Sequence, residues 1–378
     1  MPGPLAGVRV VQLASLAPAP FGCMVLADLG AEVIRVERAG GGDALAVPSG
    51  YFDRGQRSIA VDLRTPEGVQ VVLDLIRDAD VLVEGFRPGV TERLGVGPED
   101  CWRVNPGLVY GRLTGFGQDG PLASAAGHDI NYISLAGALE PIGRAGERPY
   151  APLNIVADFA GGGFLLVIGV LAALRERDVS GRGQVVDAAM VDGAALLTTF
   201  FHAMASAGLW TQERGTNFFD GGAAFYDTYE CSDGGFMAVG SVEPQFYALL
   251  LERLGLSEAD LPHPFDTSRA DELRTAFAEV FKTRTRDAWE QVFAGVDACV
   301  TPVLSPWEAH AHPHNAARDT FVEVAGQRQP APAPRFSRTP APVPGRAPRT
   351  GADTDALLTG LGYDTARLQD LRDRGIVG

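Results

Sequence analysis

The stretch Val8–Val36, VRVVQLASLAPAPFGCMVLADLGAEVIRV, predicts the fold of the first part of the chain. A short apolar run rich in β-branched residues, Val8 to Leu13, is followed by helical spacing from Phe21 to Leu29. Gly30 then ends the helix, and Glu32–Val36 is again strand-like. A strand, a helix and a second strand in this order make a βαβ unit, which places its two strands in a parallel sheet.

The same alternation continues further along the chain. Residues 69–77 have helical spacing, and residues 80–84 and 108–114 predict further buried strands. We therefore expect an α/β fold with a large doubly wound, Rossmann-like domain built on a parallel sheet. Beyond this region the pattern predicts two apolar helices and a short strand between them, over residues 158–175, 188–207 and 184–187 respectively.

The character of the chain changes after residue 210, where the first part of the large domain, residues 1–210, is expected to end. Residues 211–224 are polar and glycine-rich, which is typical of a linker. Residues 225–320 predict a smaller α+β domain, because two short strands are joined by the hairpin signal Ser232-Asp233-Gly234 and helical patterns follow. Residues 321–378 form a proline-rich strap and a C-terminal helix, which we expect to return and complete the large domain.

The composition excludes several classes of partner. The chain of 378 residues carries 47 acidic against 32 basic residues, a net charge of −15. Such an acidic chain is a poor general binder of nucleic acid and a poor match for an anionic membrane surface. The four cysteines are far apart, so neither a disulfide framework nor a zinc site is expected. The start of the chain has no signal-peptide layout, and the longest apolar stretch, residues 164–174, is too short to span a bilayer. We expect a cytoplasmic protein without a membrane partner.

The first βα turn, residues 14–22, invites a dinucleotide-binding interpretation, with Glu37 at the position of a ribose-binding acid. The turn lacks the GxGxxG pattern, however. Pro18 and Pro20 stand where glycines would let backbone amides approach a pyrophosphate. The sequence therefore disfavours a nicotinamide enzyme.

Arginines follow the predicted strands of the first domain. Arg38 comes after the second strand and Arg87 after the third, with Arg54, Arg57, Arg64 and Arg93 nearby in the sequence. Open α/β sheets bind ligands at the carboxyl ends of their strands, and the guanidinium group suits phosphates. A polyanionic ligand is one interpretation, and solvated surface charge is the other.

Two segments carry candidate catalytic side chains. His128 lies in Gly127–Tyr132, after a strand and a glycine-rich loop, where either a structural or a catalytic histidine is possible. Asp158 begins an apolar helix, as an N-cap residue does. The glycines at 161–163 would also let a ligand approach this helix end, where free amides stabilise an oxyanion.

A histidine tract is the remaining candidate. His310, His312 and His314 alternate, but Pro313 interrupts them and no catalytic zinc spacing is present. We expect no metal site there.

Taken together, the segments resemble the class III CoA-transferase superfamily and, within it, the α-methylacyl-CoA racemases. The resemblance covers essentially the whole chain. Its superfamily stretches are GPLAGVRV at 3–10, ADLGAEV at 27–33, DVLVEGFRPG at 80–89, TGFGQDGP at 114–121 and GQVVDAAM at 183–190. Two shorter runs resemble the racemases in particular, namely GHDINY at 127–132 and EPQFY at 243–247.

The resemblance implies a site and an assembly. His128 and Asp158 are the implied catalytic pair, and Glu243 is the implied partner of His128. CoA and the rest of the substrate are implied to contact Arg38, Val61, Asp62, Leu63, Arg64, Gly85, Phe86, Arg87, Arg93, Gly127, Asp129, Ile130, Asn131 and Tyr132. It also implies an interlocked homodimer, with each site between the large domain of one chain and the small domain of the other. No metal or redox cofactor is implied, since CoA is part of the substrate.

The implied reaction inverts the α-carbon of a 2-methyl-branched acyl-CoA through an enolate, a step in lipid and fatty acid metabolism. Two proton-transferring groups on opposite faces are needed, and histidine suits this role because its ordinary pKa is about 6.5. The pKa of Asp158 must be raised by burial, against the effect of the helix dipole. Backbone amides at the start of its helix are expected to stabilise the enolate, and Glu243 to favour the imidazolium form of His128.

Two alternatives remain open. In a CoA-transferase, Asp158 would attack the thioester and form a mixed anhydride. A non-catalytic CoA-binding protein is the third possibility, although it gives no role to His128, Asp158 and Glu243 together. The acyl chain also stays open between a sterol side chain, a branched fatty acid and an aryl-propionyl group.

Overall fold

The computed structural model describes residues 3–38 and 50–378, which divide into two compact units. The first unit comprises residues up to Ala136, Leu153–Leu197 and Ala317–Gly378. The second comprises Gly137–Pro152 and Thr198–Ala316.

The division corrects the boundaries that we expected from the sequence at residues 210, 225 and 320. The second unit begins at Thr198 and also takes in Gly137–Pro152 from the middle of the predicted large domain. Ion pairs explain this assignment. Arg144 pairs with Asp227 at 2.7 Å, and Arg214 pairs with Glu140 at 3.0 Å, so the segment around residue 144 is bound to the smaller unit.

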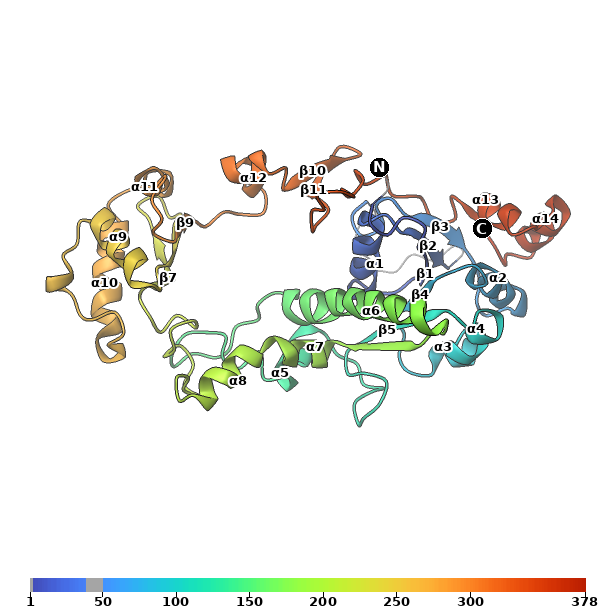
Figure 1. The fold of residues 1–378 in the computed structure, drawn as a ribbon, viewed down its shortest axis with the longest axis horizontal. Helices are drawn as coiled ribbons and strands as arrows, with labels where there is room; N and C mark the ends of the chain where they lie inside the picture. The colour runs from blue at the N-terminus through green and yellow to red at the C-terminus, as the bar shows by residue number, and fades with distance from the viewer. Residues whose placement is uncertain (1–2, 39–49) are drawn as a thin grey trace. The chain divides into compact units, whose positions relative to one another are not determined.

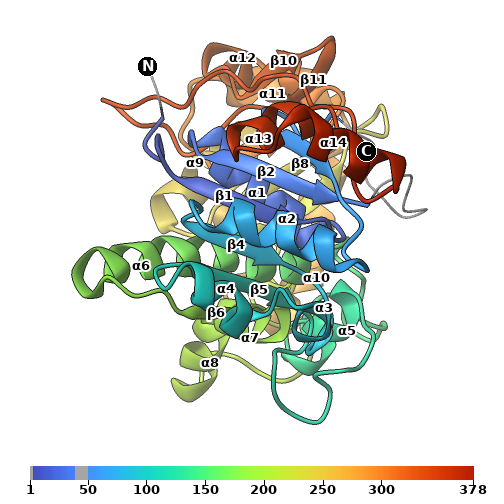
Figure 2. The same ribbon diagram turned by 90° about the vertical axis from the view of Figure 1, so that its right-hand side faces the viewer.

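The first unit is built on the predicted parallel sheet. Its six strands are ordered β3-β2-β1-β4-β5-β6, the order of a doubly wound Rossmann-type sheet. Figure 2 shows β2, β1, β4, β5 and β6 following one another across the sheet. The strands are β1 (Arg9–Leu13), β2 (Glu32–Glu37), β3 (Arg57–Ala60), β4 (Val81–Glu84), β5 (Val109–Thr114) and β6 (Val185–Ala189). The pattern gave no prediction for β3, which has four residues and joins the edge of the sheet beside β2.

Helices cover both faces of this sheet (Figure 1). On one face lie α1 (Pro18–Asp28) and α6 (Leu165–Ser180), and on the other α2 (Pro66–Ile76) and α4 (Pro98–Val104). The remaining helices of the unit are α3 (Val90–Leu94), α5 (Asp129–Leu135), α7 (Met190–Leu197), α13 (Thr354–Gly360) and α14 (Thr365–Asp373). The helix expected over 188–207 is thus interrupted, with α8 (Thr199–Ser206) falling in the second unit.

The helix expected over residues 158–175 is longer than the sequence suggested. It begins as a π-helix, Ile155–Phe164, and continues as α6. Ile155–Ser180 is therefore long and apolar enough, by length and composition alone, to cross a membrane, unlike the stretch 164–174 considered from sequence. It packs on β5 and β6, where Leu166 and Val170 are fully buried, as a core helix does.

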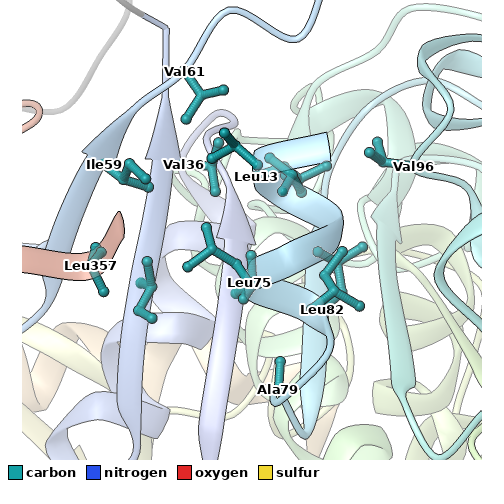
Figure 3. Close-up of a cluster of buried hydrophobic side chains, with 14 of the residues drawn as sticks. Leu13, Val36, Ile59, Val61, Leu75, Ala79, Leu82, Val96 and Leu357 are labelled. Atoms are coloured by element: carbon teal, nitrogen blue, oxygen red, sulfur yellow. The ribbon is translucent and has the colours of Figure 1, made fainter. Parts of the chain in front are cut away.

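The C-terminal segment contributes to the core of the first unit. Figure 3 shows Leu357 of α13 near Ile59 of β3, in the same cluster as Val36, Leu75 and Leu82. Burying a side chain of this size stabilises a fold by about 1.5–3 kcal/mol. In the segment before it, β10 (Phe321–Val324) and β11 (Gln327–Pro330) form an antiparallel hairpin.

The second unit is an antiparallel sheet packed against helices, as expected for an α+β domain. The strands β7 (Tyr226–Glu230), β8 (Phe236–Gly240) and β9 (Val300–Pro302) pair in that order, and Gly234 takes a φ of 80° in the predicted hairpin turn. The principal helices are α9 (Pro244–Leu254), α10 (Ala270–Phe281), α11 (Arg286–Phe293) and the short α12 (Pro313–Ala317). Tyr229, Phe281 and Trp289 are buried together in its core.

A buried arginine attaches the returning hairpin to the first unit. Arg54 is 3% exposed and pairs with Asp28 at the end of α1, at 2.5 Å. Its Nη1 also donates to Gln329 Oε1 and to the Pro330 carbonyl oxygen, both at 2.9 Å. Arg54 therefore connects α1 to β11, with 275 residues of sequence between Arg54 and Gln329.

Replacing this arginine should be costly. Arg54→Met leaves the Asp28 carboxylate buried without its cation, so we expect a loss of about 3–5 kcal/mol in the free energy of unfolding. Urea denaturation followed by circular dichroism measures it. Arg103→Met is the matched control, because Arg103 pairs with Asp100 on the surface and such pairs contribute about 0–1 kcal/mol. Equal losses in the two variants would contradict a stabilising role for the Arg54 cluster.

Candidate functional site

A pocket of about 510 Å³ opens at the carboxyl ends of the central strands of the first unit. Its walls come from the segments after β1 (residues 16–19) and β4 (85–88) and from the end of β5 (113–115). His128, Asp158 and Met190 complete the lining, with residues around them. This end of a doubly wound sheet is where ligands bind. The two side chains singled out from the sequence thus share one pocket, although their positions lie 30 residues apart.

His128 is held at the pocket wall by its backbone. It is the N-cap residue of α5, and its amide donates to Asn131 Oδ1 at 3.1 Å. The residue is exposed, so its imidazole is accessible to a ligand. Asn131 therefore caps the helix that carries His128.

Asp158 is not the N-cap residue that the sequence predicted. Asn154 has that position, and Asp158 lies in the first turn of the π-helix. Asn154 Nδ2 donates to Asp158 Oδ2 at 3.0 Å. Burial raises the pKa of Asp158 and the nearby Asp129 charge raises it further, while the Asn154 hydrogen bond and the His128 charge act in the opposite direction. The pKa of Asp158 is raised overall, as two-base chemistry requires.

The glycines after Asp158 have a different role from the one that we expected. Gly161, Gly162 and Gly163 are buried against neighbouring helices rather than open to a ligand. A Cβ added at Gly193 of α7 would lie 1.8 Å from the carbonyl oxygen of Gly161, and one at Gly163 would lie 2.6 Å from Phe21 of α1. The glycines therefore let the π-helix pack closely between α1 and α7.

Two of the amides expected to stabilise an enolate are already occupied. Asp129 Oδ2 accepts hydrogen bonds from the amides of Ala157 at 2.7 Å and Asp158 at 2.8 Å. Asp129 itself is 3% exposed, so its side chain belongs to the interior and not to the substrate surface that we expected. The Asp129 carboxylate thus occupies two amides that were expected to bind the enolate oxygen.

The other residues expected around His128 divide into two groups. Gly127 and Tyr132 line the pocket, and the Tyr132 hydroxyl donates to the Gly127 carbonyl oxygen. Ile130 and Asn131 are exposed but lie outside the pocket lining.

The segment after β4 lines the pocket with three of the expected CoA contacts, Gly85, Phe86 and Arg87. The Phe86 amide donates to Glu84 Oε2 at 2.6 Å. Burial raises the pKa of Glu84 to about 7, even though Arg112 and the Phe86 hydrogen bond oppose the shift. Glu84 was missed from the sequence, because nothing in DVLVEGFRPG distinguishes a buried carboxylate from an exposed one.

The other expected CoA contacts lie outside this pocket. Val61 is buried in the hydrophobic core, and Leu63 is partly buried against it. Arg64 forms a two-pronged ion pair with Asp62, whose pKa is lowered to about 2 mainly by Arg64 and in part by the charge of Arg38. Arg38 therefore lies near Asp62, beyond the ends of β2 and β3.

Exposed arginines remain available to an anionic ligand. Arg38, Arg87 and Arg93 are exposed, and none of them forms an ion pair with another of the described residues. Arg87 lies at the pocket, Arg38 follows β2 and Arg93 lies in the last turn of α3.

Glu243 and the histidine tract both lie in the second unit. Glu243 is exposed and is the N-cap residue of α9, so its pairing with His128 stays a prediction. In the histidine tract, His312 contacts Glu290 at 3.0 Å. Across residues 3–38 and 50–378, no group of three or more His, Cys, Asp or Glu side chains is arranged to hold a metal ion.

The chain is similar to known proteins along almost its whole length. The chain is 50% identical to "Alpha-methylacyl-CoA racemase" of Mus musculus over 375 residues, 99% of this chain and 97% of that protein. It is 46% identical to the Homo sapiens protein of the same name, with the same coverage of both chains. Among solved structures, a CAIB/BAIF family protein from Brucella suis superposes with a TM-score of 0.83 at 26% identity, over 96% of this chain and 100% of that one.

The family profile described as "CoA-transferase family III" matches residues 5–354. That match spans both compact units, including the pocket with His128 and Asp158 and the α9 segment with Glu243. The chain belongs to CoA-transferase family III.

Proposed function

We propose that the protein is an α-methylacyl-CoA racemase, which inverts the α-carbon of 2-methyl-branched acyl-CoA thioesters by proton transfer between two bases. The observation that carries the proposal is the meeting of His128 and Asp158 in one pocket at the carboxyl ends of β1, β4 and β5. The two mammalian relatives matched along almost the whole chain bear the name of this activity.

The two side chains divide the chemistry between them. In one direction a neutral His128 takes the α-proton while a protonated Asp158 delivers a proton to the opposite face, and in the other direction the roles are reversed. The raised pKa of Asp158 increases the fraction of enzyme that carries this proton near neutrality. As pH rises through that pKa, the protonated form is lost, so the direction that needs it slows. Glu243 is proposed to support the charged imidazolium between these steps.

The CoA part of the substrate would bind to the free arginines. Arg38, Arg87 and Arg93 present guanidinium groups that suit phosphate oxygens. Binding energy from this remote part positions the acyl carbon between the bases. The chemistry consists of proton transfer only, so CoA takes part as a portion of the substrate.

A CoA-transferase is the second candidate, because the family is named for that reaction. In that case the Asp158 carboxylate would attack the thioester carbonyl carbon and release the CoA thiolate, leaving a mixed anhydride. His128 would then have no defined task. The racemase proposal uses both side chains and is therefore preferred.

We also propose that two copies of the chain form an interlocked homodimer. Large apolar side chains on three helices that pack together in the first unit are exposed, with Ile155 at 53%, Ile168 at 63% and Leu196 at 64%. Apolar surface of this kind on a soluble chain indicates an interface. The second copy would also bring a second unit to the pocket of the first.

Exchange in deuterated water tests the two-base chemistry. His128→Ala and Asp158→Asn should each reduce racemisation by about 10²-fold or more, because inversion needs both groups. Each variant keeps one base, so His128→Ala should exchange the α-hydrogen of one epimer with retention, and Asp158→Asn that of the opposite epimer. Mass spectrometry and chiral analysis of each pure epimer measure this, after circular dichroism has shown both variants to be folded.

Racemisation by both variants at the parental rate would contradict the mechanism. If only Asp158 matters and hydroxylamine traps an acyl group on it, the transferase interpretation replaces the racemase. The parent enzyme, which should exchange both epimers, is the control.

Substitution of the arginines tests the CoA assignment. Arg38→Ala and Arg87→Ala should each raise KM for an acyl-CoA roughly tenfold, equivalent to about 1.4 kcal/mol, with a smaller change in kcat. Arg103→Ala is the matched control, since Arg103 pairs with Asp100 on α4 away from the pocket. Unchanged KM in both test variants would rule out their contact with the phosphates.

Sedimentation at high dilution tests the assembly. We expect a dimer at nanomolar concentration whose dissociation is accompanied by partial unfolding, because interlocked chains separate only by opening. Ile168→Glu, which places a charge on the exposed apolar surface, should weaken the dimer. A folded and active monomer would be incompatible with this proposal.

A further inference from the structure

We propose that Asp129 is a positioning residue that couples the two catalytic side chains, holding the backbone of Asp158 at a fixed place relative to His128. The inference rests on the proposed racemase function and deepens it. It assigns to Asp129 a task within the protein interior, in place of the substrate contact that the sequence suggested.

The geometry makes Asp129 a short bridge between the two bases. Asp129 follows His128 directly and is the first residue of α5. Its Oδ2 accepts from the amides of Ala157 and Asp158, at 2.7 and 2.8 Å, across 28 and 29 residues of sequence. The path from one base to the other thus consists of one peptide bond, one side chain and one pair of hydrogen bonds.

Hydrogen bonds to a carboxylate are shorter and stronger than those between neutral groups, and burial strengthens them further. Asp129 is 3% exposed, so solvent does not compete for the two amides. A displacement of about 1 Å between reacting groups can cost a factor of about 10² in rate. A rigid connection between α5 and the π-helix therefore favours proton transfer, because it limits the displacement of His128 relative to Asp158.

The Asp129 carboxylate also lacks an ion-pair partner within the part of the chain that the structure describes. Its buried Oδ1 has no hydrogen-bond partner there. The charge of Asp129 contributes to the raised pKa of Asp158, after burial. One carboxylate thus fixes the position of the acid and favours its protonated form.

Other charged and titratable groups also surround Asp158. On α5, His128 acts in the opposite direction, and Tyr132 has a pKa raised to about 12 by burial first and then by Asp158 and Asp129. Among the elements packed on the π-helix, α1 carries the buried Cys23 and Asp28, and Asp28 pairs with Arg54. On β5, Arg112 pairs with Glu84 and Glu92, and Tyr110 is buried. Asp192 of α7 and Asp187 of β6 are exposed, and Arg175, Glu176, Arg177 and Asp178 lie towards the far end of α6.

A purely structural role would give a different result from coupling. If Asp129 only stabilises the end of the π-helix, its replacement lowers the stability of the fold and leaves the pH dependence of the remaining activity unchanged. If it couples the bases, the charge of Asp129 is part of the acid–base chemistry. The pH profile of racemisation therefore separates the two roles.

Asp129→Asn and Asp129→Ala form the test. Asparagine keeps a carbonyl oxygen for the two amides but removes the charge, so the high-pH limb of kcat that reports protonated Asp158 should move to lower pH, with a loss in kcat of about tenfold or less. Alanine removes the acceptor as well, and racemisation should fall by about 10²-fold or more. Binding of free CoA, measured by titration calorimetry, should stay within about threefold of the parent in both variants.

Asp80→Asn is the matched control. Asp80 also accepts a hydrogen bond from a backbone amide of the first unit, that of Arg9 at 2.8 Å, but it lies before β4 and away from the pocket. Its pH profile should match that of the parent.

Different results would contradict the coupling role of Asp129 and the racemase function on which it rests. If the parent neither racemises nor exchanges an α-methylacyl-CoA, the proposed function is wrong. If the parent racemises but Asp129→Asn keeps the parental pH profile, the coupling role is overturned, whether or not Asp129→Ala folds. A parental rate in a folded Asp129→Ala would overturn it equally.

Discussion

The pocket depends on the close approach of two backbones, at Gly161 in the π-helix and Gly193 in α7. No side chain fits between them, because a Cβ at Gly193 would lie 1.8 Å from the Gly161 carbonyl oxygen. This contact places the first turn of the π-helix beside α5, where Asp129 accepts its amides. The glycine contact and the Asp129 hydrogen bonds together hold the turn that carries Asp158.

The pKa values of carboxylates in the first unit are shifted in opposite directions. Glu84 and Asp158 both have a raised pKa. In each case the effect of burial on the pKa exceeds the opposing effect of hydrogen bonds and nearby cations. Asp62 is chemically the same group as Asp158, yet its pKa is lowered to about 2, chiefly by its hydrogen bonds with Arg64. Acid–base character is therefore set by the surroundings of each carboxylate.

Much of the fold was predictable from local patterns. The β-branched runs around Val10, Val33 and Val81 gave the parallel sheet, and the position of His128 after β5 placed it near the strand ends. Features that depend on distant partners were not predictable. The four-residue β3 has too short a pattern to be recognised. The assignment of Gly137–Pro152 to the second unit depends on the pairing of Arg144 with Asp227, 83 residues away.

The candidate site shows the same division. His128 and Asp158 were identified by type and context, and both line the pocket. The capping role of Asn154, the buried state of Asp129 and the contacts of Gly161–Gly163 all require knowledge of what lies opposite in space. Glycines permit close approach, but the sequence does not indicate whether a ligand or another helix approaches. The pairing of Glu243 with His128 remains a prediction.

The hairpin held by Arg54 has a consequence for synthesis on the ribosome. The chain leaves the first unit after Ala136 and again after Leu197, and it re-enters the first unit for the last time at Ala317. Both segments of the second unit are therefore inserted into the first. Until residues 317–378 emerge, Arg54 lacks Gln329 and Pro330, and Ile59 lacks the cover of Leu357. Since domains tend to fold in order as they emerge, the inserted unit can complete its own core first, while the nascent sheet waits with an uncovered edge. This interval is where the growing chain is most exposed to aggregation, and where chaperone binding has the most to protect.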